Sequence, residues 1–278
     1  MSSSREYWLQ RDLIRYRRYI NQVKKIDEEL AKYYNQYYKE LLNEIKILQY
    51  TVIANNSLSN QAKLELAKEK ATIIDTILAN LSNTVATITT TYLVDNYISN
   101  SMTVIKALEK TLNKKIVFNQ PNVKLVEEII RQNWNGLTYS ERIWKNSQSL
   151  NYQLRDTLIN GVIKGSSYKD MVKEFSAKMG SDKKRSYTLI KTELKQAISR
   201  SDIDTYKRAN IEEMEIINSG KSNVCNSCAK KNHRTVKVKD AKPGVNVPPF
   251  HPNCTCSTIP VIDLSKYKDY DNEETIVL

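Results

Sequence analysis

Glycine and proline are scarce in this 278-residue chain, which contains only six of each. All of them lie after residue 120, so no strong helix breaker interrupts the first 120 residues. The sequence also lacks a run of about 18 to 20 apolar residues, the length that a membrane-spanning helix requires. Its N-terminus has no apolar segment typical of a signal peptide. These absences predict a helical first half, no membrane span and a reducing, cytosol-like environment.

The chain is strongly basic, with 43 Lys and Arg against 31 Asp and Glu and a formal net charge of +12. Such a charge favours an acidic partner, of which nucleic acid is the commonest and an anionic membrane surface the second candidate. Two basic clusters predict sequence-independent contact with double-stranded DNA. The alternative is an ordinary solvated helix face, because acidic residues lie beside the first cluster. The candidate phosphate contacts are Arg11, Arg15, Arg18, Lys183, Lys184 and Arg185.

Apolar residues recur at steps of three and four along most of the first 210 residues, which predicts a series of amphipathic helices. The first is one long helix from Tyr7 to Tyr50. Its apolar stripe would extend for about 60 Å at about 1.5 Å per residue, so we expect part of it to project as an arm that docks on a partner. In the alternative, the following helices fold back and cover the stripe as an antiparallel bundle.

Further helices are predicted from capping residues and breakers. Helices from Ser59 to Leu81 and from Thr84 to about Leu112 are expected to follow the first. Asn122 is placed to cap a helix that starts at Val123, and another helix is expected from near Ser140 to Gly161. The remaining predictions are a short helix that ends at Gly180 and a long helix from Ser181 to Asn210.

The pattern changes after Gly220, where two short strands are predicted in a loop-rich segment. Thr235-Val-Lys-Val-Lys alternates apolar and charged residues, and Ile259-Pro-Val-Ile is the second candidate. The expected fold is therefore mainly α: elongated helical N-terminal and middle regions followed by a small β/loop, zinc-ribbon-like C-terminal module. The predicted regions are a helical N-terminal region (1–120), a helical core (121–220), a Cys/His metal-binding module (221–262) and an acidic tail (263–278).

All four cysteines and both histidines lie in residues 225–256. Cys225 and Cys228 form a C-x-x-C pair, and His251-Pro-Asn-Cys254-Thr-Cys256 supplies a second cluster, the arrangement typical of a zinc ribbon. Thiolate and imidazole suit Zn²⁺, and so small a module needs an ion to supply the core that it cannot build by burial. Cys225, Cys228, Cys256 and His251 are the predicted ligands, with Cys254 as the close alternative to His251.

Other interpretations of the cysteines are two disulfides, a thioredoxin-like redox pair or plain buried thiols. Disulfides need an oxidising compartment, and the redox pair needs a βαβ context that the sequence does not predict. A catalytic zinc site is also disfavoured: there is no HExxH motif, and Pro249 and Asn253 flank His251 where a deaminase would place a glutamate. A structural metal site is therefore the prediction, with His233 as a solvated loop residue.

The segments VCNSC (224–228) and PPFHPNCTC (248–256) resemble the C-terminal signature of the phage Mu F-like minor head proteins, also called phage head morphogenesis proteins. The resemblance covers about residues 130 to 262. It extends to Lys191-Thr-Glu193, where members usually carry Arg-Thr-Glu, so Lys191 would replace a bidentate guanidinium with a point charge.

This resemblance implies a minor capsid protein rather than an enzyme, portal-associated inside the phage head and acting in capsid assembly. The implied partners are the portal protein, the major capsid or scaffolding protein, and DNA that the protein contacts or accompanies on ejection. The implied location is the virion, after assembly in the host cytoplasm. On this interpretation, the long N-terminal helix is the arm that faces the portal or the capsid.

The alternative function is a metal-dependent nuclease or a toxin-like effector that is packaged in the virion. A nuclease needs a carboxylate or a second histidine beside its metal. Asp240 is the only acidic residue between 216 and 262, and it lies next to a turn, where Asp is common. The composition of the module therefore favours the structural role.

Overall fold

The structure is a computed structural model of the chain. It describes residues 4–55, 57–117, 119, 121–134, 136–218, 224–263 and 276–277. The chain divides into two compact units that interleave along the sequence. The first unit comprises residues 1–23, 90–138 and 189–278, and the second comprises residues 24–89 and 139–188. The predicted boundaries at residues 120, 220 and 262 stay predictions, and most of the predicted acidic tail lies outside the described residues.

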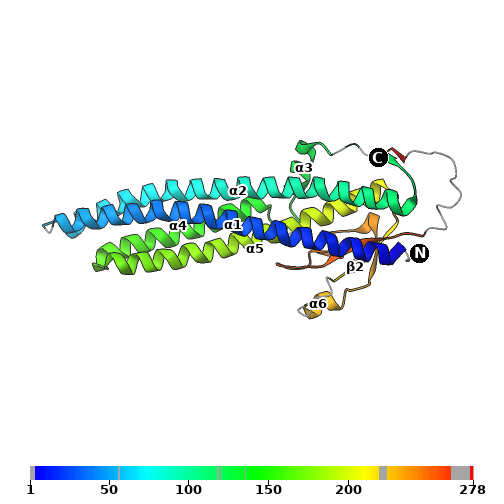
Figure 1. Cartoon of the computed structure of the whole chain (residues 1–278). Coiled ribbons are helices and arrows are strands. Elements are labelled where there is room, and N and C mark those ends of the chain that lie inside the picture. Colours follow the sequence, from blue (N-terminus) through cyan, green and yellow to red (C-terminus); the bar gives the residue numbers. More distant parts are fainter. Residues whose placement is uncertain are drawn as a thin grey trace. The chain divides into compact units, whose positions relative to one another are not determined.

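The second unit is built from four helices that lie side by side (Figure 1). They are parts of α1 (Ser4–Ala54), α2 (Asn60–Leu112) and α5 (Tyr168–Arg208), together with all of α4 (Tyr139–Lys164). Tyr34, Val85, Leu150 and Asp182, one from each helix, line a single small gap and are themselves buried. The apolar faces of the four helices therefore form one shared core.

The apolar stripe of α1 is covered within this unit. Leu41, Ile45 and Leu48 are no more than 1% exposed. The Tyr38 hydroxyl donates to the Val172 carbonyl oxygen of α5 at 3.3 Å, and the hydroxyls of Tyr37 and Thr84 of α2 lie 3.0 Å apart. For the part of α1 in this unit the antiparallel bundle is therefore the observed arrangement, whereas Leu13 and Ile20 nearer the N-terminus are 46% and 39% exposed and the docking arm stays a prediction there.

Two predicted helix breaks are wrong, because burial on both sides of each break favours a continuous helix. The second and third predicted helices form the single helix α2, in which Leu81 and Val85 on either side of the expected break are 3% and 2% exposed. Gly180 lies inside α5, between the buried residues Met179 and Asp182. A mid-helix glycine costs about 1 kcal/mol relative to alanine, which this packing outweighs.

The predicted start of the shorter helix after the first proline is confirmed. The Asn122 side chain accepts a hydrogen bond from the Lys124 backbone N–H at 2.9 Å and caps α3 (Val123–Ile130). This bond satisfies one of the backbone donors that a helix N-terminus leaves unpaired.

The first unit contains a three-stranded antiparallel sheet in the order β3-β2-β4. The central strand is β2 (Glu213–Ile217), and its edges are β3 (Thr235–Lys237) and β4 (Ser257–Val261). A separate parallel pair joins β1 (Ile116–Val117) to β5 (Ile276–Val277). The mainly α fold with a small C-terminal β/loop module is thus confirmed, although β2 itself was not predicted.

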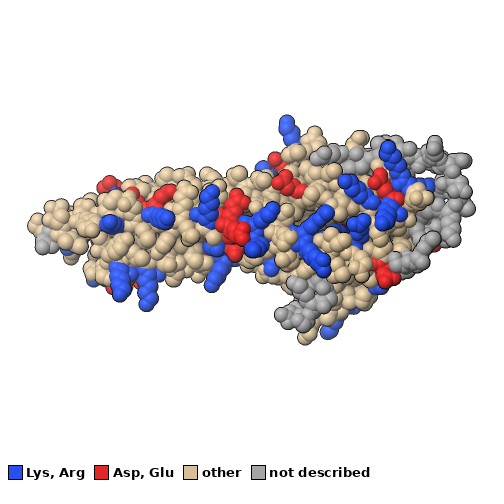
Figure 2. All heavy atoms as spheres, viewed as in Figure 1, with Lys and Arg blue, Asp and Glu red and all other residues tan. Residues whose placement is uncertain are grey.

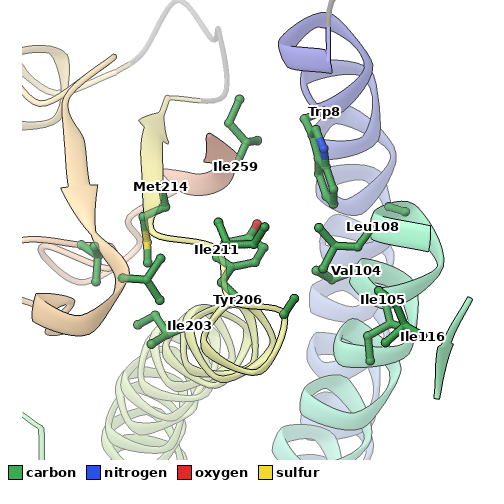
Figure 3. Close-up of a cluster of buried hydrophobic side chains, with 14 of the residues drawn as sticks. Trp8, Val104, Ile105, Leu108, Ile116, Ile203, Tyr206, Ile211, Met214 and Ile259 are labelled. Carbon is green, nitrogen blue, oxygen red and sulfur yellow. The ribbon is translucent and has the colours of Figure 1, made fainter. Parts of the chain in front are cut away.

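The core of the first unit joins this sheet to three helices. Trp8 of α1, Leu108 of α2 and Tyr206 of α5 point into one cluster with Met214 of β2 and Ile259 of β4, and all five are fully buried (Figure 3). The sheet is therefore anchored to the helices by apolar burial, which at about 25 cal/mol per Å² is the main stabilising contribution here.

A buried ion pair lies in the helical part of the first unit. The Arg15 Nη2 atom lies 2.5 Å from Asp202, and their side chains are only 8% and 1% exposed. The Asn100 amide donates to the same carboxylate at 2.8 Å. Although burial opposes its charge, the attraction of Asp202 raises the pKa of Arg15.

Within the described part of the chain, no helix has the length and apolar composition to cross a membrane.

Candidate metal centre

The C-x-x-C pair is presented by a single helical turn. Cys225 is the N-cap residue of α6 (Asn226–Ala229), and Cys228 lies within that helix. The Ala229 N–H donates to the Cys225 carbonyl oxygen at 2.9 Å, so the backbone curls around the two thiols. This turn brings both sulfur atoms to the same side of the backbone, as a metal-binding knuckle requires.

The second cluster forms a comparable turn. The Cys254 N–H donates to the His251 carbonyl oxygen at 3.1 Å, and Asn253 takes a φ of 62°. Asparagine is one of the few non-glycine residues that tolerates this left-handed conformation. The Asn253 N–H in turn donates to the Thr192 hydroxyl of α5 at 3.3 Å, which attaches the turn to the helix.

The two turns bring all five predicted ligands together. The ligand atoms of Cys225, Cys228 and His251 lie within 4.8 Å of one another, and so do those of Cys228, Cys254 and Cys256. Cys228 belongs to both groups. All four cysteines are free thiols, and only Cys225 is exposed. The cluster can therefore hold a metal ion.

The distances between these atoms resemble the edges of a zinc tetrahedron. The Cys228 and Cys254 sulfur atoms are 3.8 Å apart, and His251 Nε2 lies 3.1 Å from Cys228 Sγ and 3.3 Å from Cys225 Sγ. Tetrahedral coordination with Zn–S near 2.3 Å and Zn–N near 2.0 Å places two sulfurs about 3.8 Å apart, and sulfur and nitrogen about 3.5 Å apart. The donor set thus suits a thiophilic ion, with the five ligand atoms in two overlapping groups of three that share Cys228.

The imidazole of His251 is oriented for this role. Its Nδ1–H donates to the Pro252 carbonyl oxygen at 2.8 Å, which leaves Nε2 to face the thiols. Metal-bound histidines are usually held by such a bond from the other ring nitrogen. Although burial opposes the imidazolium, the bond to Pro252 and the nearby thiolates raise the pKa of His251.

The thiols influence one another strongly. A hydrogen bond from Cys256 lowers the pKa of the Cys254 thiol to about 5, whereas burial raises the pKa of Cys228 to about 12. Several thiolates this close together repel one another, so the protein alone favours a partly protonated cluster. A divalent cation relieves that repulsion, because it binds the thiolates and releases their protons.

Little apolar surface supports this cluster. The buried side chains around it are Cys228, Cys254 and Cys256 themselves, with Val224 and Phe250 packed against them. His233 lies elsewhere: its Nδ1 is 2.7 Å from Glu215 of β2 and 3.1 Å from Arg5. A bound ion would therefore supply much of the stabilisation that apolar burial supplies in the rest of the chain.

The six predicted phosphate contacts differ in their exposure and in their partners. Arg15 is buried against Asp202, which removes it from any exposed interface. Arg11 donates a hydrogen bond to Tyr7, and Arg18 donates one to Thr103. Lys183 forms an ion pair with Asp27, and Arg185 forms one with Asp182. Lys184 is exposed. Figure 2 shows Lys and Arg spread over the face in view, with Asp and Glu among them.

Thr192 and Glu193 have structural roles that the sequence pattern did not reveal. Besides the Thr192 contact with the second turn, the Glu193 carboxylate accepts a hydrogen bond from Trp134 Nε1 at 3.0 Å. The resemblance at Lys191-Thr-Glu193 was the only signal available, and it did not identify these partners. Two segments with the family pattern, Lys191-Thr-Glu193 and the second turn, thus meet in space.

Residues 152–259 match the family described as Phage Mu protein F like protein. The match contains both cysteine pairs, His251, the β2 and β3 strands and Lys191-Thr-Glu193. It supports the resemblance seen in the sequence and points to phage head morphogenesis. No curated protein and no solved structure matches the chain.

Proposed function

We propose that this chain is a minor capsid protein that acts in phage head assembly, portal-associated on the inside of the head. The observation that carries the proposal is the family match over residues 152–259, within which both metal-binding turns fall. The partners proposed from the family are the portal protein and the major capsid or scaffolding protein. The location is the virion, after assembly in the host cytoplasm.

The metal centre is proposed as a structural zinc site. Cys225, Cys228 and His251 supply three ligands, and the 3.8 Å separation from Cys228 favours Cys254 as the fourth. The sequence pattern favoured Cys256, rather than Cys254, as the ligand that joins Cys225, Cys228 and His251. When bound, Zn²⁺ would join the two turns and replace a hydrophobic core.

A closed site of this kind favours an assembly role over catalysis. The two ligand groups in the described residues consist of Cys and His alone, whereas catalytic zinc keeps a position open for water. The alternative, a metal-dependent nuclease or packaged effector, predicts cleavage of plasmid DNA in the presence of divalent metal. Cleavage that disappears on Cys228→Ser would replace the structural proposal.

Contact with double-stranded DNA is the part of the proposal that rests on charge. The net charge of +12 and exposed side chains such as Lys184 support weak, sequence-independent binding. Changing Lys183, Lys184 and Arg185 to Glu should then weaken duplex binding, most clearly at low salt. If the wild-type protein binds no duplex at low salt, the excess charge has another role.

The decisive experiment follows the protein into particles. Cells that assemble heads would receive the wild-type chain, Cys228→Ser or the matched control Ser227→Ala in the same turn. The wild type and the control should be incorporated and crosslink to the portal, and Cys228→Ser should be excluded. A wild-type chain absent from purified heads, full and empty, would contradict the assembly role.

A further inference from the structure

A second site lies in the first unit, apart from the metal ligands. It is a cavity of about 740 Å³ bordered by the end of α3, the last turns of α5 and the turn at residues 241–245. Small-molecule and cofactor sites typically measure about 300 to 1,000 Å³, so the cavity has the size of a ligand site. None of the five candidate metal ligands lines it.

The lining of this cavity carries an excess of positive charge. Arg200, Lys207, Arg208 and Lys242 contribute cations, and Asp204 is the single acidic lining residue. The Asp204 carboxylate accepts a hydrogen bond from the Tyr97 hydroxyl at 2.5 Å, so part of its hydrogen-bonding capacity is used within the protein. The balance favours an anionic ligand.

Arg200 is held in position before any ligand arrives. Its Nη1 donates to the Ile129 carbonyl oxygen at 2.9 Å and to the Gln132 side chain, and these are its only hydrogen bonds to described residues. Burial lowers the pKa of Arg200, because its charge is poorly hydrated. A fixed guanidinium is the donor that phosphate and carboxylate groups bind most specifically.

Trp134 adds an aromatic surface whose orientation is also fixed. Its Nε1 donates to Glu193, and a Cβ placed on Gly244 would lie 3.1 Å from the indole ring. Gly244 has a φ of +86°, so both its conformation and its closeness to the ring require glycine. The indole and the turn that borders the cavity therefore support each other.

A second cavity, of about 510 Å³, shares the lining residue Lys207 with the first. Lys237 and Lys239 of the sheet region line it, opposite Glu212 and Glu213. A ligand that occupies both cavities must be extended and must place its strongest negative charge in the first. A chain of phosphates has that form.

We propose that these cavities bind a single-stranded segment of nucleic acid, with phosphates at Arg200, Lys207 and Lys242 and a base against Trp134. Paired cations and an aromatic ring are the usual means by which proteins hold single strands without sequence preference. A cavity of this volume takes a nucleotide rather than a duplex. This site is independent of the proposed assembly role and of the duplex contacts described above.

The test measures binding of an oligothymidylate of about six nucleotides to the full chain, by anisotropy and by tryptophan fluorescence. Lys207→Gln with Lys242→Gln should weaken binding about tenfold and reduce the salt slope by about 1.4, since each phosphate contact in a single strand contributes about 0.7. Trp134→Phe should abolish the fluorescence response, whereas Trp144→Phe should retain it.

The matched control removes the same charge elsewhere, with Lys169→Gln and Lys173→Gln on the exposed part of α5. Equal weakening by this control, or a fluorescence response that survives Trp134→Phe, would overturn the site. If thymidine monophosphate competes as well as the oligonucleotide, the cavity binds phosphate but its ligand is a free nucleotide, which would overturn the assignment to a single strand. Tighter, Lys207-dependent binding of a glutamate-rich peptide would overturn the nucleic-acid assignment.

Discussion

The four-helix unit and the module around the cysteines are stabilised in different ways. In the helices, large side chains such as Leu41, Ile45 and Leu48 are removed from water along the whole bundle. In the module, the buried cluster consists of three cysteines with Val224 and Phe250 at its edge. Apolar burial is the main stabilising contribution in the first region, whereas the second would depend on the ligands of the proposed zinc site.

This difference makes the two regions separable by experiment. Loss of an apolar contact should weaken the bundle by a graded amount, because neighbouring side chains partly relax around the gap. Loss of a ligand of the proposed zinc site should remove the order of both cysteine-bearing turns, because a single ion would hold them together. Changes at Cys228 and Leu41 test this contrast directly, and two further changes in the first unit give its scale; the four are taken from the largest expected effect to the smallest.

Cys228→Ser should have the largest effect, because Cys228 belongs to both groups of candidate ligands. Structural zinc contributes about 10 to 16 kcal/mol of apparent binding free energy in small domains, so we expect loss of about one zinc per chain and loss of order in the two turns that carry the ligands, at residues 225–229 and 251–256. Elemental analysis and hydrogen exchange measure the two effects. The control Ser227→Ala should keep the metal, and bundle amides should stay protected in both variants. If the purified wild-type protein lacks metal and its thiols are oxidised, the zinc site is wrong and the disulfide interpretation is correct.

Asp202→Asn should destabilise the first unit by about 3 to 5 kcal/mol, since it leaves the buried Arg15 charge without its partner. The free energy of unfolding in urea is the measurement. Arg17→Met, which changes an exposed charge on the same helix, should be nearly neutral. Equal effects of the two substitutions would mean that Arg15 reaches water when the pair is broken.

Leu41→Ala should lower the free energy of unfolding by about 2 to 5 kcal/mol, the usual cost of a large-to-small change at a fully buried site. Ile47→Ala on the same helix is the control, since Ile47 is 40% exposed and should cost much less. Zinc content should be unchanged in both. A Leu41→Ala protein that also loses its metal would show that the two regions are not separable.

Glu215→Gln should have the smallest effect, about 1 kcal/mol near neutral pH, because Arg5 is half exposed. The hydrogen bonds from Arg5 lower the pKa of Glu215. Its contribution is therefore present above the unfolded value of about 4.3 and is lost as the pH falls through the lower folded value. Urea unfolding of wild type and variant should differ near pH 7 and converge at acid pH; a constant difference would exclude the ionised pair.

The helices were predictable because their apolar residues repeat at the helical period, and the Asn122 cap was predictable from the chemistry of its side chain. The breaks near Leu81 and at Gly180 were wrong because local preference was outweighed by burial against other helices. The strand β2 was missed because four of its five residues are buried, so the alternation that marks a half-exposed strand is absent.

The five candidate ligands were predictable from their spacing, and the structure brings them together. Their support was not predictable: Thr192 lies 61 positions from Asn253, and no local pattern connects them. The burial of Arg15 was hidden for the same reason, since its partner Asp202 is distant in sequence. Charge and motif reveal what a residue can do, but tertiary contacts decide whether it is accessible.

The contact between Gly244 and Trp134 has an evolutionary consequence. Any side chain at Gly244 would meet the indole at about 3.1 Å and would also need a backbone conformation that L-residues avoid. Replacement of Trp134 by a smaller residue would remove the collision but not the backbone requirement. Among related chains, we therefore expect the glycine to persist where the tryptophan has changed, and the tryptophan never to persist where the glycine is lost.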